Sequence, residues 1–239
     1  RPVPKPLKKE AHMSKRHPII SVTGSSGAGT TSVKKTFQRI FRREKITAAY
    51  IEGDAFHRYD RVEMKRVMAD EEKKGNRHFS HFGPEANRLE DLEEVFREFG
   101  ETGGGRTRHY VHDDDEAKKY GSPPGTFTDW ENIPEDTELL FYEGLHGAVV
   151  TGEVDVARHC DLKIGVVPVV NLEWIQKIHR DKMDRGYSHE AIKETILRRM
   201  PDYLDYICPQ FSETDINFQR VPTVDTSNAF IARWIPPPD

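Results

Sequence analysis

The chain has 239 residues, with 36 Lys and Arg against 40 Asp and Glu, so its formal net charge is −4. This mildly acidic balance argues against a general nucleic-acid-binding protein, because phosphate binding needs a basic field. Apolar residues, 36% of the chain, suffice for a folded domain, but no uninterrupted apolar run reaches the roughly 20 residues of a membrane-spanning helix.

The first predicted elements form a strand, a loop, a helix and a second strand. Residues 1–13 contain three prolines and lack apolar periodicity, so we expect a tag or a disordered arm there. The remainder, 14–239, is expected to be a single domain. Residues 19–22 are a short β-branched run that stops at a glycine turn, which predicts a buried strand. Apolar spacing predicts a helix over 31–43 and a strand over 46–51, completing a βαβ unit.

Farther along the chain, strands and helices continue to alternate. Strands are expected at 139–142 and 162–167, and helices at 85–99, 171–183 and 188–200. Residues 102–138 are instead rich in Gly, Pro, Asp and Thr, and within them only 106–112 looks like a strand. Segments of this length are usually functional or mobile loops. The pattern predicts an α/β fold with a mostly parallel sheet and helices on both faces.

The loop between the first predicted strand and helix has the features of a phosphate-binding P-loop. It fits the frame G-x-x-x-x-G-K-[ST], except that Thr30 stands in place of the lysine. Glycines let backbone N–H groups turn toward a phosphate, the helix N-terminus adds positive charge, and the Thr31 hydroxyl is placed for Mg²⁺. A plain Gly/Ser turn would explain the composition but not the position. The candidate nucleotide-binding residues are Gly24, Ser25, Ser26, Gly27, Ala28, Gly29, Thr30 and Thr31.

Two acidic residues follow predicted strands. Asp54 comes just after the strand 46–51, at the sheet edge where ligands bind in open α/β folds. It can accept the proton of a hydroxyl that attacks a γ-phosphoryl group, or simply cap a helix. Glu143 ends the strand 139–142 and resembles a Walker B carboxylate that holds Mg²⁺ directly or through water, with a strand-end cap as the alternative.

A late helix carries a charged face. Lys177, Arg180 and Asp181 lie at positions i, i+3 and i+4 of the predicted helix, which typically forms an exposed salt-bridge ladder. Because the P-loop lysine is missing, however, Lys177 and Arg180 together with Arg185 can supply positive charge to the phosphates. We therefore expect a lid near 181–187 that closes over the nucleotide.

Longer segments carry a resemblance to a known family. They are GSSGAGTTS, IEGDAFHR, RTRHYVHDD, LLFYEGLHGAVV, KIGVVPVVNLEWIQKIHRD and PQFSETDINFQRVPTVDTSN. Together they resemble the bacterial class of phosphoribulokinases from about residue 14 to residue 235. The resemblance implies a P-loop kinase fold of the nucleoside-monophosphate-kinase type. It also implies ATP- and Mg²⁺-dependent phosphorylation of D-ribulose 5-phosphate at its 1-hydroxyl, which gives ribulose 1,5-bisphosphate in the Calvin cycle.

The resemblance also implies roles for individual residues. Asp54 matches the catalytic base, and Asp181 matches a second essential acid at the metal and the phosphate. Glu143 matches the Walker B-like carboxylate. The phosphate contacts that it implies are Lys177, Arg180 and Arg185, and the substrate contacts are His57 and Arg61. The basic and ring residues Arg108, Tyr110 and His112 add candidate contacts to the sugar phosphate, with a polar edge strand as the alternative.

Regulation and assembly are expected from the same resemblance. It implies a homo-octamer that is activated by NADH and inhibited by AMP, with Arg43 linked to the NADH response and Arg198 to cooperative activation. Cys160 and Cys208 match neither position of the cysteine switch found in plant relatives, and their spacing suits no metal site, so a reducing compartment, the cytoplasm, is expected. Bacterial members continue beyond residues 233–239, so the chain is expected to be truncated.

Two other functions remain open at this point. A uridine-kinase-like nucleoside kinase shares the P-loop, the acid at the strand end and the lid, but leaves the segments 106–114 and 210–228 unexplained. A non-catalytic nucleotide-binding regulatory subunit fits the missing lysine. The presence of Asp54, Glu143 and Asp181 argues against that subunit, because a chain without catalysis has no chemical need for all three acids.

Overall fold

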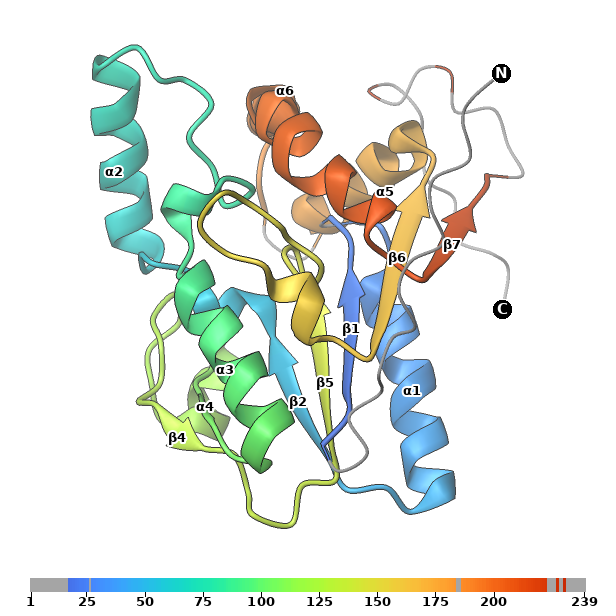
Figure 1. The fold of residues 1–239 in the computed structure, drawn as a ribbon. Helices are drawn as coiled ribbons and strands as arrows, with labels where there is room; N and C mark the ends of the chain where they lie inside the picture. Colours follow the sequence, from blue (N-terminus) through green and yellow to red (C-terminus); the bar gives the residue numbers. More distant parts are fainter. Residues whose placement is uncertain (1–16, 26, 184–185, 223–226, 228–229, 231–239) are drawn as a thin grey trace.

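Five strands form one parallel sheet in the order β2-β5-β1-β6-β7 (Figure 1). The computed structural model describes residues 17–25, 27–183, 186–222, 227 and 230, so the expected N-terminal arm and the last nine residues lie outside it. The strands are β1 (Ile19–Thr23), β2 (Ala48–Glu52), β5 (Leu139–Gly144), β6 (Leu162–Pro168) and β7 (Ile216–Arg220). All four pairings are parallel. The carboxyl ends of the strands therefore meet at one edge, the upper edge in Figure 1.

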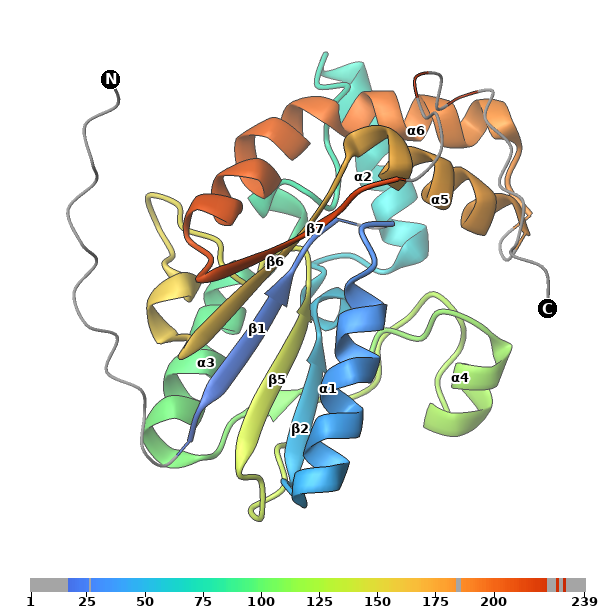
Figure 2. The ribbon, with the colours of Figure 1, turned by 90° about the vertical axis from the view of Figure 1, so that its right-hand side faces the viewer.

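The sheet is covered by a helix on each face, as the alternation of strands and helices predicts. Ile19 pairs with Leu140 in register, and both side chains pack toward α3 (Leu89–Thr102). The neighbouring Phe141 points to the other face and contacts Phe37 and Phe41 of α1 (Thr30–Glu44). Figure 2 shows α1 on the near side of the sheet and α3 on the far side. Because both faces are buried, the central strands consist of nearly continuous apolar runs.

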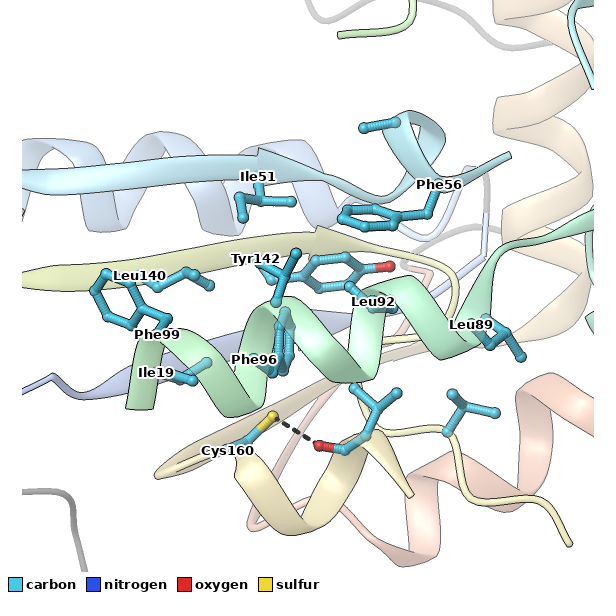
Figure 3. Close-up of a cluster of buried hydrophobic side chains, with 14 of the residues drawn as sticks. Ile19, Ile51, Phe56, Leu89, Leu92, Phe96, Phe99, Leu140, Tyr142 and Cys160 are labelled. Atoms are coloured by element: carbon cyan, nitrogen blue, oxygen red, sulfur yellow. Dashed lines mark hydrogen bonds between the residues drawn. The ribbon is translucent and has the colours of Figure 1, made fainter. Parts of the chain in front are cut away.

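The largest core cluster lies between α3 and the sheet (Figure 3). Leu92, Phe96 and Phe99 of α3 recur every three or four residues and are fully buried, as expected for one face of an amphipathic helix. The Phe96 ring meets Tyr142 of β5 edge-on, with 5.4 Å between ring centroids. The prediction that this helix begins at residue 85 is wrong, because Pro84–Ala86 forms a separate 3-10 turn before it.

Helices and turns gather at the carboxyl edge of the sheet. They are α2 (Arg61–Lys73), α5 (Val170–Met183) and α6 (His189–Asp202), with short turns at Gly53–Phe56, Tyr203–Ile207 and Cys208–Ser212. Beside the sheet lie a 3-10 turn, Val156–His159, the helix α4 (Asp114–Tyr120) and a two-stranded ribbon of β3 (Arg106–Thr107) and β4 (Glu131–Asn132). Within the described ranges, no helix combines the length and apolar character that crossing a membrane requires.

The predicted strand at 106–112 is wrong over most of its length. Only its first two residues are in β3, and Tyr110 makes a single isolated bridge to Phe127. The ends of the other predicted elements differ from the observed ends by a few residues at most. The strand expected at 46–51 is β2, and the helices expected at 171–183 and 188–200 are α5 and α6.

Candidate active site

The loop between β1 and α1 is closely packed on two sides. Gly29 has φ = 100° and caps α1, and Gly27 has φ = 104°, values that favour glycine. A Cβ atom at Gly27 would lie 2.9 Å from the backbone oxygen of Glu173 on α5, and one at Gly29 would overlap the guanidinium group of Arg220 at the end of β7. These glycines therefore allow α5 and β7 to approach the loop. Ser26 lies outside the described residues.

Thr30, in the position of the P-loop lysine, contacts Glu143, the residue before the end of β5. Thr30 is 8% exposed, and its hydroxyl donates a hydrogen bond to Glu143 Oε1 at 2.5 Å, whereas Thr31 is exposed. Burial raises the pKa of Glu143, and the neighbouring carboxylates of Glu52 and Asp54 act in the same direction. Lys34 of α1 forms an ion pair with Glu52. Carboxylates are thus concentrated beside the P-loop.

This group of oxygen donors fits Mg²⁺. Among the described residues, no three His, Cys, Asp or Glu side chains form a metal cage by themselves. Mg²⁺ rarely needs one, because it usually binds one or two carboxylates together with phosphate oxygens and water. The half-buried Glu143 and the Thr30 hydroxyl are such donors, and burial together with the nearby carboxylates raises the pKa of Glu143.

Asp54 lies between two histidines. It belongs to the 3-10 turn directly after β2, and its two carboxylate oxygens face His57 Nε2 and His112 Nε2, each at 3.4 Å. Burial lowers the pKa of His57 below its ordinary value, so this ring is neutral at pH 7. The Asp54 side chain is 39% exposed. A carboxylate that lies between two imidazole rings and is open to solvent is suited to accept a proton from a bound hydroxyl.

The predicted substrate-binding side chains divide into two groups. Arg61, Tyr110 and His112 lie together: Arg61 Nη2 donates to the His112 carbonyl oxygen at 2.8 Å, and the rings of Tyr110 and His112 meet at 4.9 Å. Arg108 instead points at the backbone of the turn that carries Asp54. Its Nε and Nη2 atoms donate to the carbonyl oxygens of Ala55 and His57 at 2.8 and 2.9 Å.

Burial lowers the pKa of Arg108 to about 10, so its guanidinium group stays charged at neutral pH. The group also lies 3.6 Å from the centroid of the Phe127 ring. A half-buried cation with two backbone acceptors and an aromatic face is well placed to fix the turn that carries Asp54.

The charged face of α5 is buried rather than exposed. Lys177 Nζ lies 2.5 Å from Asp181 Oδ2, and Arg180 Nη2 lies 2.8 Å from Asp181 Oδ1. The Lys177 and Asp181 side chains are 9% and 6% exposed, so this is no solvated ladder. Burial lowers the pKa of Lys177 to about 8. Burial also acts to raise the pKa of Asp181, but the two cations outweigh it and hold that pKa below its ordinary value. Arg185 lies outside the described residues.

The two predicted regulatory arginines, Arg43 and Arg198, are not part of the charged cluster on α5. Arg43 is in the last turn of α1 and 75% exposed, paired with Glu44. This end of α1 lies at the edge of the sheet opposite the P-loop (Figure 1). Arg198 is on α6, where its carbonyl oxygen lies 3.3 Å from His78 Nδ1.

Besides Lys34, three charged residues near the described part of the site were not among the predicted ones. Glu52 lies two residues before Asp54, and its position at a strand end was a usable signal. Glu173, in the first turn of α5, is 4% exposed. Arg220 ends β7, a strand whose other four residues are exposed.

Glu173 should make stability depend on pH. Within the described part of the chain its Oε2 atom has no hydrogen-bond partner, and burial raises its pKa to about 7. A carboxyl whose folded-state pKa is raised destabilises the fold as pH rises from its ordinary pKa toward 7. Glu173→Gln should therefore raise the free energy of unfolding at pH 8, by on the order of 3 kcal/mol, and change it little near pH 4.5.

Thermal unfolding at the two pH values measures this effect. The exposed Glu194 of α6 provides the matched control, Glu194→Gln, which should show no such difference. An equal gain for Glu173→Gln at both pH values would contradict the assignment of an ionisable, uncompensated carboxyl.

Comparisons with known proteins point to one family. A family model described as "Phosphoribulokinase / Uridine kinase family" matches residues 19–227. A phosphoribulokinase of Nitrobacter vulgaris is 71% identical over 227 residues, which cover 95% of this chain and 78% of the relative. The solved structure of a phosphoribulokinase from Rhodobacter spheroides has a TM-score of 0.83 at 62% identity and covers 93% of this chain and 77% of that one. A D-glycerate 3-kinase from Cryptococcus neoformans, 11% identical with a TM-score of 0.56, shares the fold.

Proposed function

Because the chain belongs to the phosphoribulokinase / uridine kinase family, we propose that it transfers the γ-phosphoryl group of ATP to the 1-hydroxyl of D-ribulose 5-phosphate. The products are D-ribulose 1,5-bisphosphate and ADP, as the Calvin cycle requires. The observation that carries the proposal is the position of Asp54, beside the P-loop and between His57 and His112. The high identity to phosphoribulokinases supports the choice of substrate.

ATP binds with its phosphates at the P-loop, where backbone N–H groups and the N-terminus of α1 favour negative charge. Glu143 and the threonine hydroxyls of the loop would hold Mg²⁺, which neutralises part of the phosphate charge when it is bound. Position 30 adds no cation, since it is a threonine bonded to Glu143. Lys177 and Arg180, both held by Asp181, supply positive charge from α5 instead.

Transfer needs a base on the acceptor side. Asp54 takes the proton of the 1-hydroxyl as that oxygen forms a bond to the γ-phosphorus, and the bond from phosphorus to the bridging oxygen of ADP breaks. Arg61, Tyr110 and His112 surround the space next to Asp54 and bind the sugar phosphate. Arg108 contributes by fixing the turn that carries the base.

The choice of acceptor is tested by ADP release in the presence of Mg²⁺ and ATP, with either ribulose 5-phosphate or uridine. We expect turnover with ribulose 5-phosphate and none above background with uridine. Turnover with uridine alone would identify a nucleoside kinase, and ATP binding without turnover on either acceptor would identify a regulatory subunit. An assay without acceptor is the control, because it measures the background hydrolysis of ATP.

The proposal extends to regulation, assembly and location, because the chain is similar to bacterial phosphoribulokinases. Activation by NADH, inhibition by AMP and assembly into a homo-octamer are supported by that similarity and by the surface position of Arg43. The cytoplasm is the proposed location, supported by the need for ATP and by the free thiols of Cys160 and Cys208.

A further inference from the structure

The P-loop lacks the cation that its motif normally carries. At the lysine position, Thr30 is a buried neutral residue whose hydroxyl is bonded to Glu143. The nearest cations on α5, Lys177 and Arg180, share the carboxylate of Asp181, which offsets part of their charge. A further positive group near this loop would therefore strengthen its binding of phosphates.

Arg220 brings a guanidinium group to this loop from a strand that comes 192 positions after Ala28 in the sequence. It is the last residue of β7 and pairs in register with the end of β6, at the carboxyl edge of the sheet. Its Nη1 atom donates to the carbonyl oxygen of Ala28 at 3.0 Å and to Oε1 of Gln176 on α5 at 3.0 Å. It also fills the space where Gly29 lacks a side chain.

The charge of Arg220 is available at this position. Both acceptors, a backbone carbonyl and an amide oxygen, are neutral, and within the described ranges no carboxylate pairs with this arginine. A guanidinium group has five N–H donors, and only Nη1 is engaged by these residues. The other donors remain for an anion, and planar guanidinium groups bind phosphates strongly.

We propose that Arg220 is a nucleotide-binding residue that replaces the absent P-loop lysine: Ala28 and Gln176 orient its guanidinium group, and its remaining N–H groups bind the phosphate chain of the nucleotide. The inference rests on the proposed use of ATP. The proposal also gives a function to one residue of the segment 210–228, for which the sequence pattern alone indicated none. A purely structural role, in which Arg220 only supports the loop, is the alternative that the experiment must separate.

Two variants at this position separate charge from support. Arg220→Gln keeps an N–H donor for the Ala28 carbonyl but removes the charge, whereas Arg220→Lys keeps the charge. The probes are ADP and adenosine, whose binding is measured by isothermal titration calorimetry. We expect Arg220→Gln to weaken ADP binding by about 10- to 100-fold, the effect of losing a charged hydrogen bond to a phosphate. Arg220→Lys should restore most of the affinity, and adenosine binding should stay unchanged in both.

The inference would be overturned by native ADP affinity in Arg220→Gln, or by equal losses for ADP and adenosine in both variants, which would indicate support alone. Arg39→Gln, at an exposed position of α1, is the matched control and should bind ADP as the native chain does. If Arg220→Gln does not fold, Arg220→Lys decides: ADP affinity within about tenfold of native supports the charge role, and a loss beyond about 100-fold contradicts it.

The design also separates this inference from the proposed function. ADP binding needs no sugar acceptor, so it can be measured whether or not ribulose 5-phosphate is phosphorylated. A native chain that binds ADP but transfers no phosphate would contradict the proposed reaction while the comparison of Arg220 variants still stands.

Discussion

Asp54→Asn should lower kcat with ribulose 5-phosphate by at least about 100-fold, while the affinity for ADP stays within a few-fold of native. Asparagine keeps the size of the side chain and the contacts to His57 and His112, but it cannot accept the hydroxyl proton. The loss therefore falls on the chemical step rather than on nucleotide binding. Steady-state turnover, together with calorimetric titration of ADP, gives the two quantities.

Asp70→Asn is the matched control for this variant. Asp70 is a carboxylate on α2 that pairs only with the exposed Lys73 in the described residues, so its loss should leave kcat unchanged. Turnover of Asp54→Asn close to native would remove Asp54 from the role of base. A large loss of ADP affinity would instead place this carboxylate at the nucleotide.

Asp181→Asn should lower kcat by about 100- to 1,000-fold and also reduce the free energy of unfolding by about 3 kcal/mol. The change leaves Lys177 and Arg180 without the carboxylate that orients both. It also removes a charge that raises the pKa of Lys177, so more of this buried amine is neutral at pH 7.5. Less positive charge from Lys177 is then available to the transferred phosphoryl group.

Asp181→Glu separates the charge from its position. It keeps the carboxylate but moves it, so we expect stability near native and an intermediate kcat. Chemical denaturation and turnover at saturating substrates measure both effects. If Asp181→Asn kept native kcat, α5 would have only a structural part in the enzyme.

The sheet and its covering helices were predictable because their sequences follow simple periods. The buried strands β1, β5 and β6 are short apolar runs, and α3 repeats its apolar residues every three or four positions. The helix α2 lacks that signal, since Met64 is its one buried residue, and its start depends on the capping box of Asp60 and Glu63. The strand β7 is exposed along most of its length, so no alternation of buried and exposed residues marks it.

The candidate site was predictable where a residue's place in the chain fixes its place in space. Asp54 follows β2 and Glu143 lies in the last two residues of the neighbouring parallel strand β5, and such strand ends share one edge of the sheet. The direction of a long side chain carries no such signal. Arg108 and Tyr110 are neighbours in the loop, yet one holds a backbone turn and the other faces His112. The contact of Arg220 with Ala28 joins residues 192 positions apart and depends on the folded sheet.

The close approach of Arg220 to Gly29 also limits how this protein can evolve. A side chain at position 29 would occupy the volume of the Arg220 guanidinium group. Arg220 can therefore keep its place only if residue 29 is a glycine. If the arginine is lost, a lysine at position 30 gains selective value, whereas the left-handed backbone at position 29, with φ = 100°, still favours glycine. Among homologues, positions 30 and 220 should therefore covary, although they lie far apart in the sequence.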